Sequence, residues 1–165
     1  MNLRTMTLLT LGAGFALAGC QTRPQVTIDT PITAAELAPY KKRGTATVVG
    51  RAVLKDAIGK TATCRGQQVL LTPAVAYNRQ MVAAMRAGQK PVAGPNVGTT
   101  EAYWRKAVCD ARGRFRFHNV PAATWYVSIP VHWPDEPREG AVIKEVRVPP
   151  GGTVNVLLSE RDALR

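Results

Sequence analysis

Arginine and phenylalanine side chains alternate in one segment of the second half of the chain. In ARGRFRFHNV, residues 111–120, arginine occupies positions 112, 114 and 116 and phenylalanine positions 115 and 117. Successive side chains of a β-strand point to opposite faces, so the segment predicts a strand with one basic and one aromatic face. Guanidinium groups suit phosphate and carboxylate ligands, whereas separate arginines are also ordinary on a solvent-facing sheet. The spacing leaves both interpretations open.

The candidate binding residues lie on this strand and on the one before it. Arg112 is expected in the preceding turn, which leaves Arg114, Arg116 and His118 as the basic row. Arg105 precedes the turn and is expected to extend the row from the neighbouring strand. The sequence therefore predicts an anionic-ligand face made of Arg105, Arg114, Arg116 and His118.

No constellation for catalysis is evident in the sequence. It holds two histidines and lacks a Gly-x-Ser-x-Gly elbow, a His-Glu-x-x-His pair and a phosphate-binding loop. Cys64, Cys109, His118 and His132 are the residue types of a zinc site, but none lies at a close ligand spacing. Acidic residues at 135, 136 and 139 are better interpreted as a solvated loop than as a cation site. We expect no enzyme activity, no metal and no cofactor.

The first residues have the pattern of an export signal. Arg4 gives a positive start, residues 6–18 are apolar, and LAGC ends at Cys20. A transmembrane helix needs about 18 or more apolar residues, and this run is shorter. LAGC resembles the lipobox of bacterial lipoproteins, in which the chain is cleaved before a cysteine that carries a diacylglycerol. The resemblance implies a signal peptide at 1–19 and lipidation of Cys20.

A lipid anchor would decide the compartment of the protein. Two or more acyl chains are needed for stable attachment, and a lipoprotein anchor supplies them. Gln21, where an Asp would favour the inner membrane, implies by the same resemblance the outer membrane. We therefore expect a lipid-anchored outer-membrane protein whose domain faces the periplasm.

The charge of the chain restricts its partners. It has 22 Lys and Arg against 11 Asp and Glu, a formal net charge of +11. Such an excess favours acidic partners, among them phospholipid and lipopolysaccharide phosphates and peptidoglycan carboxylates. Because the chain is expected to be exported, nucleic acid is not an expected partner. The expected partners are the membrane, through the anchor, and either an envelope protein or an anionic glycan or lipid.

Cys64 and Cys109 remain once Cys20 is assigned to the anchor. An even pair of cysteines in an oxidising compartment predicts a disulfide between them.

The rest of the chain divides into a tether, a domain and a tail. Residues 20–43 contain three prolines and little periodicity, which predicts an extended tether with at most a short helical turn at TAAE. Residues 44–160 alternate in hydropathy in several short stretches, with one helical pattern around residues 77–85. About seven short strands and one short helix predict an all-β sandwich. Residues 161–165 form a short C-terminal tail.

A longer motif supports this fold. DARGRFRFHNVPAATWYVSI resembles the D-x-x-G-x-F-x-F-x-x-[IVL]-P-[AP]-G-x-Y-x-V stretch of carboxypeptidase regulatory-like domains, which are transthyretin-like β-sandwiches. The matching residues are Asp110, Gly113, Phe115, Phe117, Val120, Pro121 and Val127. Ala123 and Trp125 depart from the family's usual Gly and Tyr. The resemblance implies a transthyretin-like sandwich of about seven strands with one short helix inserted. It also implies that the domain acts as a non-catalytic accessory module.

Two functional hypotheses follow. The first is a non-catalytic envelope lipoprotein, an accessory interaction or structural module at the outer membrane. The second is a binding module for an anionic envelope polymer, lipopolysaccharide or peptidoglycan, that uses the basic sheet face.

Overall fold

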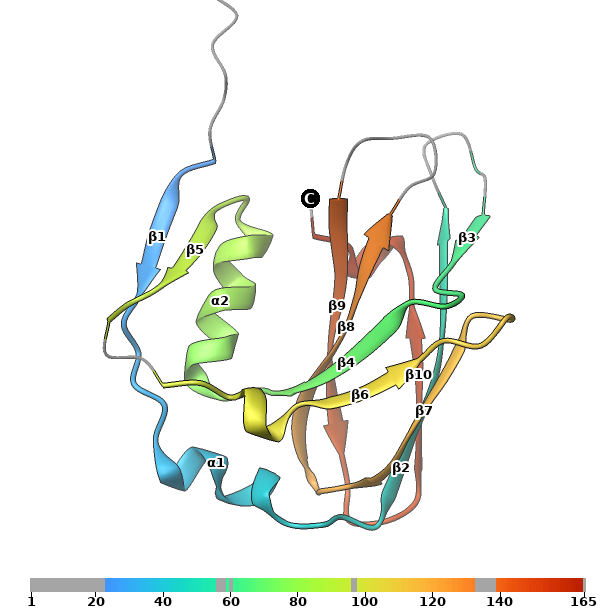
Figure 1. Ribbon diagram of the computed structural model, residues 1–165, viewed down its shortest axis with the longest axis horizontal. Helices are drawn as coiled ribbons and strands as arrows, with labels where there is room; N and C mark the ends of the chain where they lie inside the picture. Colours follow the sequence, from blue (N-terminus) through green and yellow to red (C-terminus); the bar gives the residue numbers. More distant parts are fainter. Residues whose placement is uncertain (1–22, 56–58, 60, 96–97, 133–138, 165) are drawn as a thin grey trace, which may run out of the picture.

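Two β-sheets face each other in the computed structural model, which describes residues 23–55, 59, 61–95, 98–132 and 139–164 (Figure 1). The strands and two α-helices confirm the prediction of an all-β sandwich, with one helix more than expected. None of the helices in these ranges is long and apolar enough to span a membrane.

The first sheet is built around β2 (Ala46–Lys55), whose side chains alternate between the core and the outer face. β10 (Thr153–Leu158) pairs with β2 in parallel along one edge. β7 (Arg114–Val120) and β3 (Thr61–Thr63) pair with it antiparallel, one after the other, along the other edge. Among the described strands, β7 therefore lies at an edge of this sheet. Its residues 114–117 alternate between the outer face and the core, as the sequence predicts.

The second sheet is antiparallel, in the order β6-β4-β8-β9. Its strands are β6 (Arg105–Val108), β4 (Gln68–Pro73), β8 (Ala123–His132) and β9 (Glu139–Val148). Pro130 has no N–H and cannot donate a hydrogen bond to a neighbouring strand. It lies within β8, two residues beyond Ser128, the last residue paired with β4. At Pro130 the strand has a described partner on one side only, which suits a residue without an N–H.

The core between the sheets is centred on Trp125, which is completely buried. The ring of Tyr40 meets it edge-on, with the ring centroids 4.8 Å apart. The Tyr40 hydroxyl donates a 2.7 Å hydrogen bond to the carbonyl oxygen of Thr124. Tyr40 belongs to α1 (Ala34–Lys41), so this helix closes one end of the sandwich (Figure 1).

The described part of the predicted tether is packed on the domain and is not an extended link. β1 (Gln25–Ile28) pairs in parallel with β5 (Lys90–Ala93). α1 begins at the predicted capping box but continues two residues past Pro39, where the sequence indicated a stop. Leu37 and Tyr40 pack against the core, and this burial outweighs the local cost of the proline.

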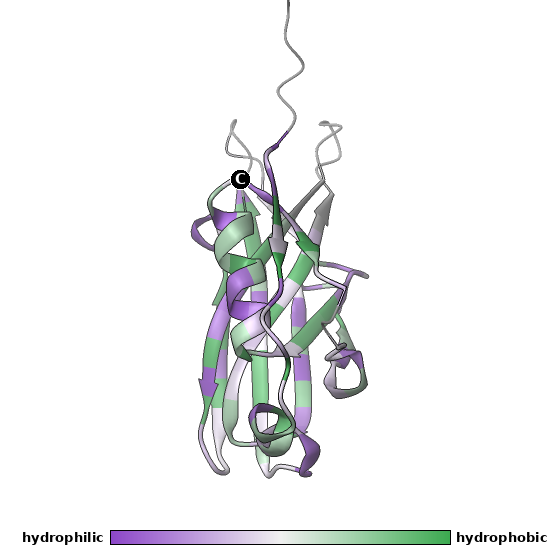
Figure 2. Cartoon of the chain, turned by 90° about the vertical axis from the view of Figure 1, so that its left-hand side faces the viewer, coloured by the Kyte–Doolittle hydropathy of each residue, from purple (hydrophilic) through white to green (hydrophobic). Residues whose placement is uncertain are grey.

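The helical pattern around residues 77–85 forms α2 (Ala76–Arg86), which lies against the outer face of the second sheet. Val82 and Met85 pack on Tyr126 of β8 and Ile143 of β9. Figure 2 looks onto this side, with α2 in front of the sandwich strands. The short 3-10 turns η1 (Glu101–Tyr103) and η2 (Glu160–Asp162) complete the described elements.

One carboxylate connects the two α-helices. Glu36 Oε2 accepts hydrogen bonds from the backbone N–H and the hydroxyl of Thr33, which closes the capping box of α1. Oε1 accepts the backbone N–H of Ala76, the first residue of α2, at 3.1 Å. Val75, the N-cap of α2, makes no side-chain capping bond, so Glu36 supplies this function from outside the helix. The hydrogen bond from Ala76, and next that from Thr33, hold the pKa of Glu36 below its usual range.

Replacing Glu36 with Ala should lower the free energy of unfolding by roughly 1 to 2 kcal/mol, the typical effect of losing a helix cap. Because the pKa is depressed in the folded state, this contribution is complete above the usual carboxyl range and is lost as pH falls through the folded pKa. Urea denaturation at neutral and acidic pH measures it. Glu160→Ala, which removes an exposed acid in η2, is the control. An equal loss of stability in both variants would contradict the capping role.

Candidate functional site

The two sheets differ in what covers their outer faces. α2, β1 and β5 lie beside the second sheet, and α1 lies at one end of the sandwich (Figure 1). No helix of the described residues lies over the outer face of β2, β7 and β10. This face is therefore the open one, and its side chains can meet a ligand.

Two rows of outward side chains cross the open face. The strand register places Leu157, Arg51 and Arg114 in one row and Asn155, Val49 and Arg116 in the next. All three arginines are exposed, while Phe115, between two of them on β7, is buried on the inner side. Neighbouring positions across paired strands lie about 4.5–5.5 Å apart, so each row brings its side chains within contact of one another.

A hollow of about 850 Å³ lies over these rows and extends to β6. Its charged lining residues are Arg51, Lys106, Asp110, Arg114 and Arg116. Among the described lining residues, four cationic side chains thus face a single acid. This imbalance in one concave place gives the hollow a positive potential.

Aliphatic side chains share the hollow with the cations. Val108 is 65% exposed and Leu157 is 57% exposed, and both line it. The lining therefore offers charged donors beside small apolar patches. A ligand that suits it carries oxyanions together with C–H surface, as an acidic sugar does.

A tight turn orients Arg114 at one end of the hollow. Asp110 Oδ1 accepts the backbone N–H groups of Arg112 and Arg114 at 2.8 and 2.9 Å, and Oδ2 accepts the Nε–H of Arg114 at 2.8 Å. These bonds, led by the one from the Arg114 backbone, hold the pKa of Asp110 below its usual range. Gly113 has φ of +70°, a conformation that glycine adopts without strain. Arg114 remains 58% exposed, so the turn orients the side chain without hiding it.

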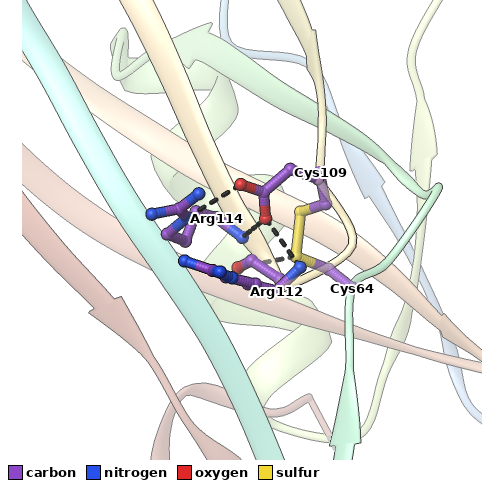
Figure 3. Close-up of polar contacts among 6 residues, drawn as sticks. Cys64, Cys109, Arg112 and Arg114 are labelled. Carbon is purple, nitrogen blue, oxygen red and sulfur yellow. Dashed lines mark hydrogen bonds and ion pairs between the residues drawn. A yellow bond between two sulfur atoms is a disulfide. The ribbon is translucent and has the colours of Figure 1, made fainter.

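The predicted disulfide is confirmed and lies directly beside this turn (Figure 3). Cys64 follows β3 of the first sheet and Cys109 follows β6 of the second, so the bond links the two sheets. Both cysteines are 3% exposed. Since their sulfurs are joined to each other, they are not free to act as zinc ligands or nucleophiles in this state.

Arg105 is placed apart from the other predicted binding residues. β6 pairs with β4 so that Arg105 stands opposite Leu71, a residue of the core. The guanidinium carbon of Arg105 lies 5.8 Å from the centroid of the Trp125 ring, and its buried Nε has no hydrogen-bond partner among the described residues. Burial also lowers its pKa. Arg105 thus contacts the core, and its neighbour Lys106 lines the hollow.

His118 is exposed but is not among the residues that line the hollow. It precedes Asn119, which has a positive φ of 55°, where the pairing of β7 with β2 shifts register. The structure thus brings together Arg114 and Arg116 from the predicted set. It adds Arg51 and Lys106, which the sequence pattern alone does not place in the row. The alternation of residues 45–53 predicts that Arg51 shares a strand face with Val49. The sequence does not show that this strand pairs with β7, which is what brings Arg51 beside Arg114.

The side chains of the remaining candidate residues of the sequence analysis are not among those that the structure describes. Cys20 and the loop acids at 135 and 136 lie outside the described residues, as do the side chains of His132 and Glu139.

Among solved structures, this chain is similar to a proposed carbohydrate-binding protein of Pseudomonas aeruginosa. It is 27% identical, and the alignment covers 78% of this chain and 97% of that one with a TM-score of 0.64. Two structures of the major pilin subunit of Bacillus cereus align with TM-scores of 0.34 and 0.36, at 11% and 9% identity. These alignments cover 70% and 71% of this chain and 30% of each pilin chain. No protein-family model matches the sequence, and neither does a curated protein.

Removing the disulfide should destabilise the fold and loosen the turn that carries Arg114. For a sequence separation of 45, the chain-entropy model gives a loss of about 4 kcal/mol in the free energy of unfolding. Guanidinium denaturation of Cys64→Ala with Cys109→Ala, beside reduced wild type, measures it. Wild type that unfolds at the same denaturant concentration before and after verified reduction would contradict this role.

Proposed function

We propose that this domain is a non-catalytic carbohydrate-binding module that binds an anionic glycan of the cell envelope in the hollow on its first sheet. The observation that carries the proposal is the gathering of Arg51, Lys106, Arg114 and Arg116 around one concave place on the uncovered sheet face. The likeness to the proposed carbohydrate-binding protein of Pseudomonas aeruginosa supports a binding role for this fold.

The lining favours an anionic glycan over a neutral one. Sites for neutral sugars commonly offer an exposed aromatic face. The one aromatic residue among the described lining residues is Phe115, and it is 4% exposed. Arginine forks instead offer paired donors to carboxylate or phosphate groups. The net charge of +11 raises the local concentration of such polymers around the whole domain.

The envelope location rests on the proposed lipid anchor at Cys20. β1 begins at Gln25 and is packed on the domain, so only residues 21–24 separate the anchor from it. Even fully extended, the five residue steps from Cys20 to Gln25 span at most about 18 Å. An anchored protein would therefore hold its domain close to the bilayer. Lipopolysaccharide and peptidoglycan supply anionic groups near an outer membrane, and these are the polymers we propose as ligands.

The double variant Arg114→Ala with Arg116→Ala should bind lipopolysaccharide or peptidoglycan sacculi about tenfold more weakly or worse, because each arginine loses charge-assisted hydrogen bonds. Co-sedimentation at low and high salt measures this, and wild-type binding should fall as salt rises.

The matched control for this variant removes the same charge elsewhere. Arg147→Ala with Arg161→Ala replaces two exposed arginines that do not line the hollow. An equal loss of binding in both double variants would show an effect of net charge and would contradict a site in the hollow. Binding to neither polymer, together with crosslinking in cells to one discrete protein, would favour an accessory role in a protein assembly.

Cys20→Ser should release the protein from membranes, since the sulfur that would carry the lipid is gone. Cell fractionation followed by immunoblotting measures it. The control is Arg147→Ala, which replaces one exposed residue, keeps Cys20 and should leave the protein with the membranes. Membrane retention of Cys20→Ser would contradict the anchor.

A further inference from the structure

Two like charges stand directly opposite each other in the first sheet. The register of β2 and β7 pairs Arg51 with Arg114, and both side chains are exposed on the outer face. Like charges at directly opposed positions destabilise a sheet. The next row contains no such conflict, because Arg116 there faces Val49. Asp110 pairs with the Nε of Arg114 at 2.8 Å and offsets part of the repulsion between the two arginines, which leaves an excess positive charge at this position of the hollow.

We propose that Arg51 and Arg114 form a clamp for a single oxyanion group, a carboxylate or a phosphate, of the glycan. The inference rests on the proposed function and specifies the residues and the ligand group that recognition uses. An oxyanion between two guanidinium forks accepts several charge-assisted hydrogen bonds and replaces their repulsion by attraction.

The surroundings of Arg114 leave it suited to this role. The hydrogen bond to Asp110 uses its Nε–H, so the two terminal nitrogens are not engaged by that bond. The same carboxylate fixes the backbone on either side of the turn, and the disulfide holds the turn from the adjacent residue Cys109. The fork is thus oriented before a ligand arrives, which reduces the entropy lost on binding.

Neighbouring side chains extend the clamp along the ligand. Arg116 follows Arg114 by two residues on the same face of β7, at a spacing of about 6.7 Å. It can meet a second anionic group of the same chain. Leu157, on the other side of Arg51 in the same row, offers apolar contact to a sugar ring. A glycan with repeated anionic groups should therefore bind more tightly than an isolated anion.

The clamp has a signature that a purely structural role would not give. Without ligand, removal of Arg51 relieves the repulsion and should stabilise the protein, whereas with ligand the same change removes a contact. Stability and binding should thus move in opposite directions for Arg51→Thr. A structural arginine would lose stability on replacement.

Thermal unfolding at low ionic strength tests this, with inorganic sulfate and sodium chloride at matched ionic strength as probes. Wild type should gain more stability from sulfate than from chloride. Arg51→Thr should melt about 1 to 4 °C higher without sulfate and lose the sulfate-specific gain. Arg51→Lys keeps the charge but not the fork, and should lose most of that gain.

Arg147→Thr is the matched control, because it also replaces an exposed arginine by threonine within a strand. It should keep the sulfate-specific gain. An Arg51→Thr protein that melts no higher than wild type and keeps the gain would overturn the clamp, as would an equal rise in melting temperature for Arg147→Thr.

Polymer binding separates this inference from the proposed function. Arg51→Thr should bind lipopolysaccharide or sacculi about tenfold more weakly than wild type. Polymer binding that depends on Arg114 and Arg116 but not on Arg51 would overturn the clamp and support the proposed function. A sulfate effect that requires Arg51, with no polymer binding by wild type, would support the oxyanion site and overturn the glycan.

Discussion

The unequal covering of the two sheets is the constraint on which the rest of the structure depends. A sheet face that packs against another layer is mostly apolar, whereas a face that meets water carries most of the charged side chains. The outer face of the second sheet carries Tyr126 and Ile143 and is covered by α2. The outer face of the first sheet carries Arg51, Arg114 and Arg116 instead. The apolar outer face of the second sheet is thus buried under α2, and the cationic side chains lie on the outer face of the first sheet, where no described helix covers them.

Both edges of the sandwich are fastened near the ends of the open face. At one edge the Cys64–Cys109 disulfide joins the sheets beside the Asp110 turn. At the other, Lys144 of β9 donates a 3.0 Å hydrogen bond to the carbonyl oxygen of Leu157 on β10. Leu157 and Arg114 are the two ends of the row that contains Arg51. The positions of the side chains in this row therefore depend on contacts that also hold the two sheets together.

The sequence predicts the features that local patterns determine. It does not predict those that depend on which strand or helix packs against a segment. Alternation alone puts Arg114 and Arg116 on one face, and cysteine parity predicts the disulfide. Which side of a strand faces the core depends on its neighbour, and for this reason the sequence groups Arg105 with the basic row although its side chain lies against Trp125. The register of β2 with β7 is equally nonlocal, so Arg51 was not selected. α1 continues beyond Pro39 because Tyr40 packs against Trp125, and no local sequence pattern indicates this contact.

A sheet surface suits a repeated anionic ligand for geometric reasons. Side chains on one face recur at a fixed interval along a strand and at a shorter one between strands, so the cations form a rigid grid. Each surface charge alone contributes little in water and is screened by salt. A polymer that contacts several of these charges at once sums their small binding free energies, while it loses translational and rotational entropy only once. A fixed grid of arginines on the uncovered face therefore favours a chain of anionic groups over a single small anion.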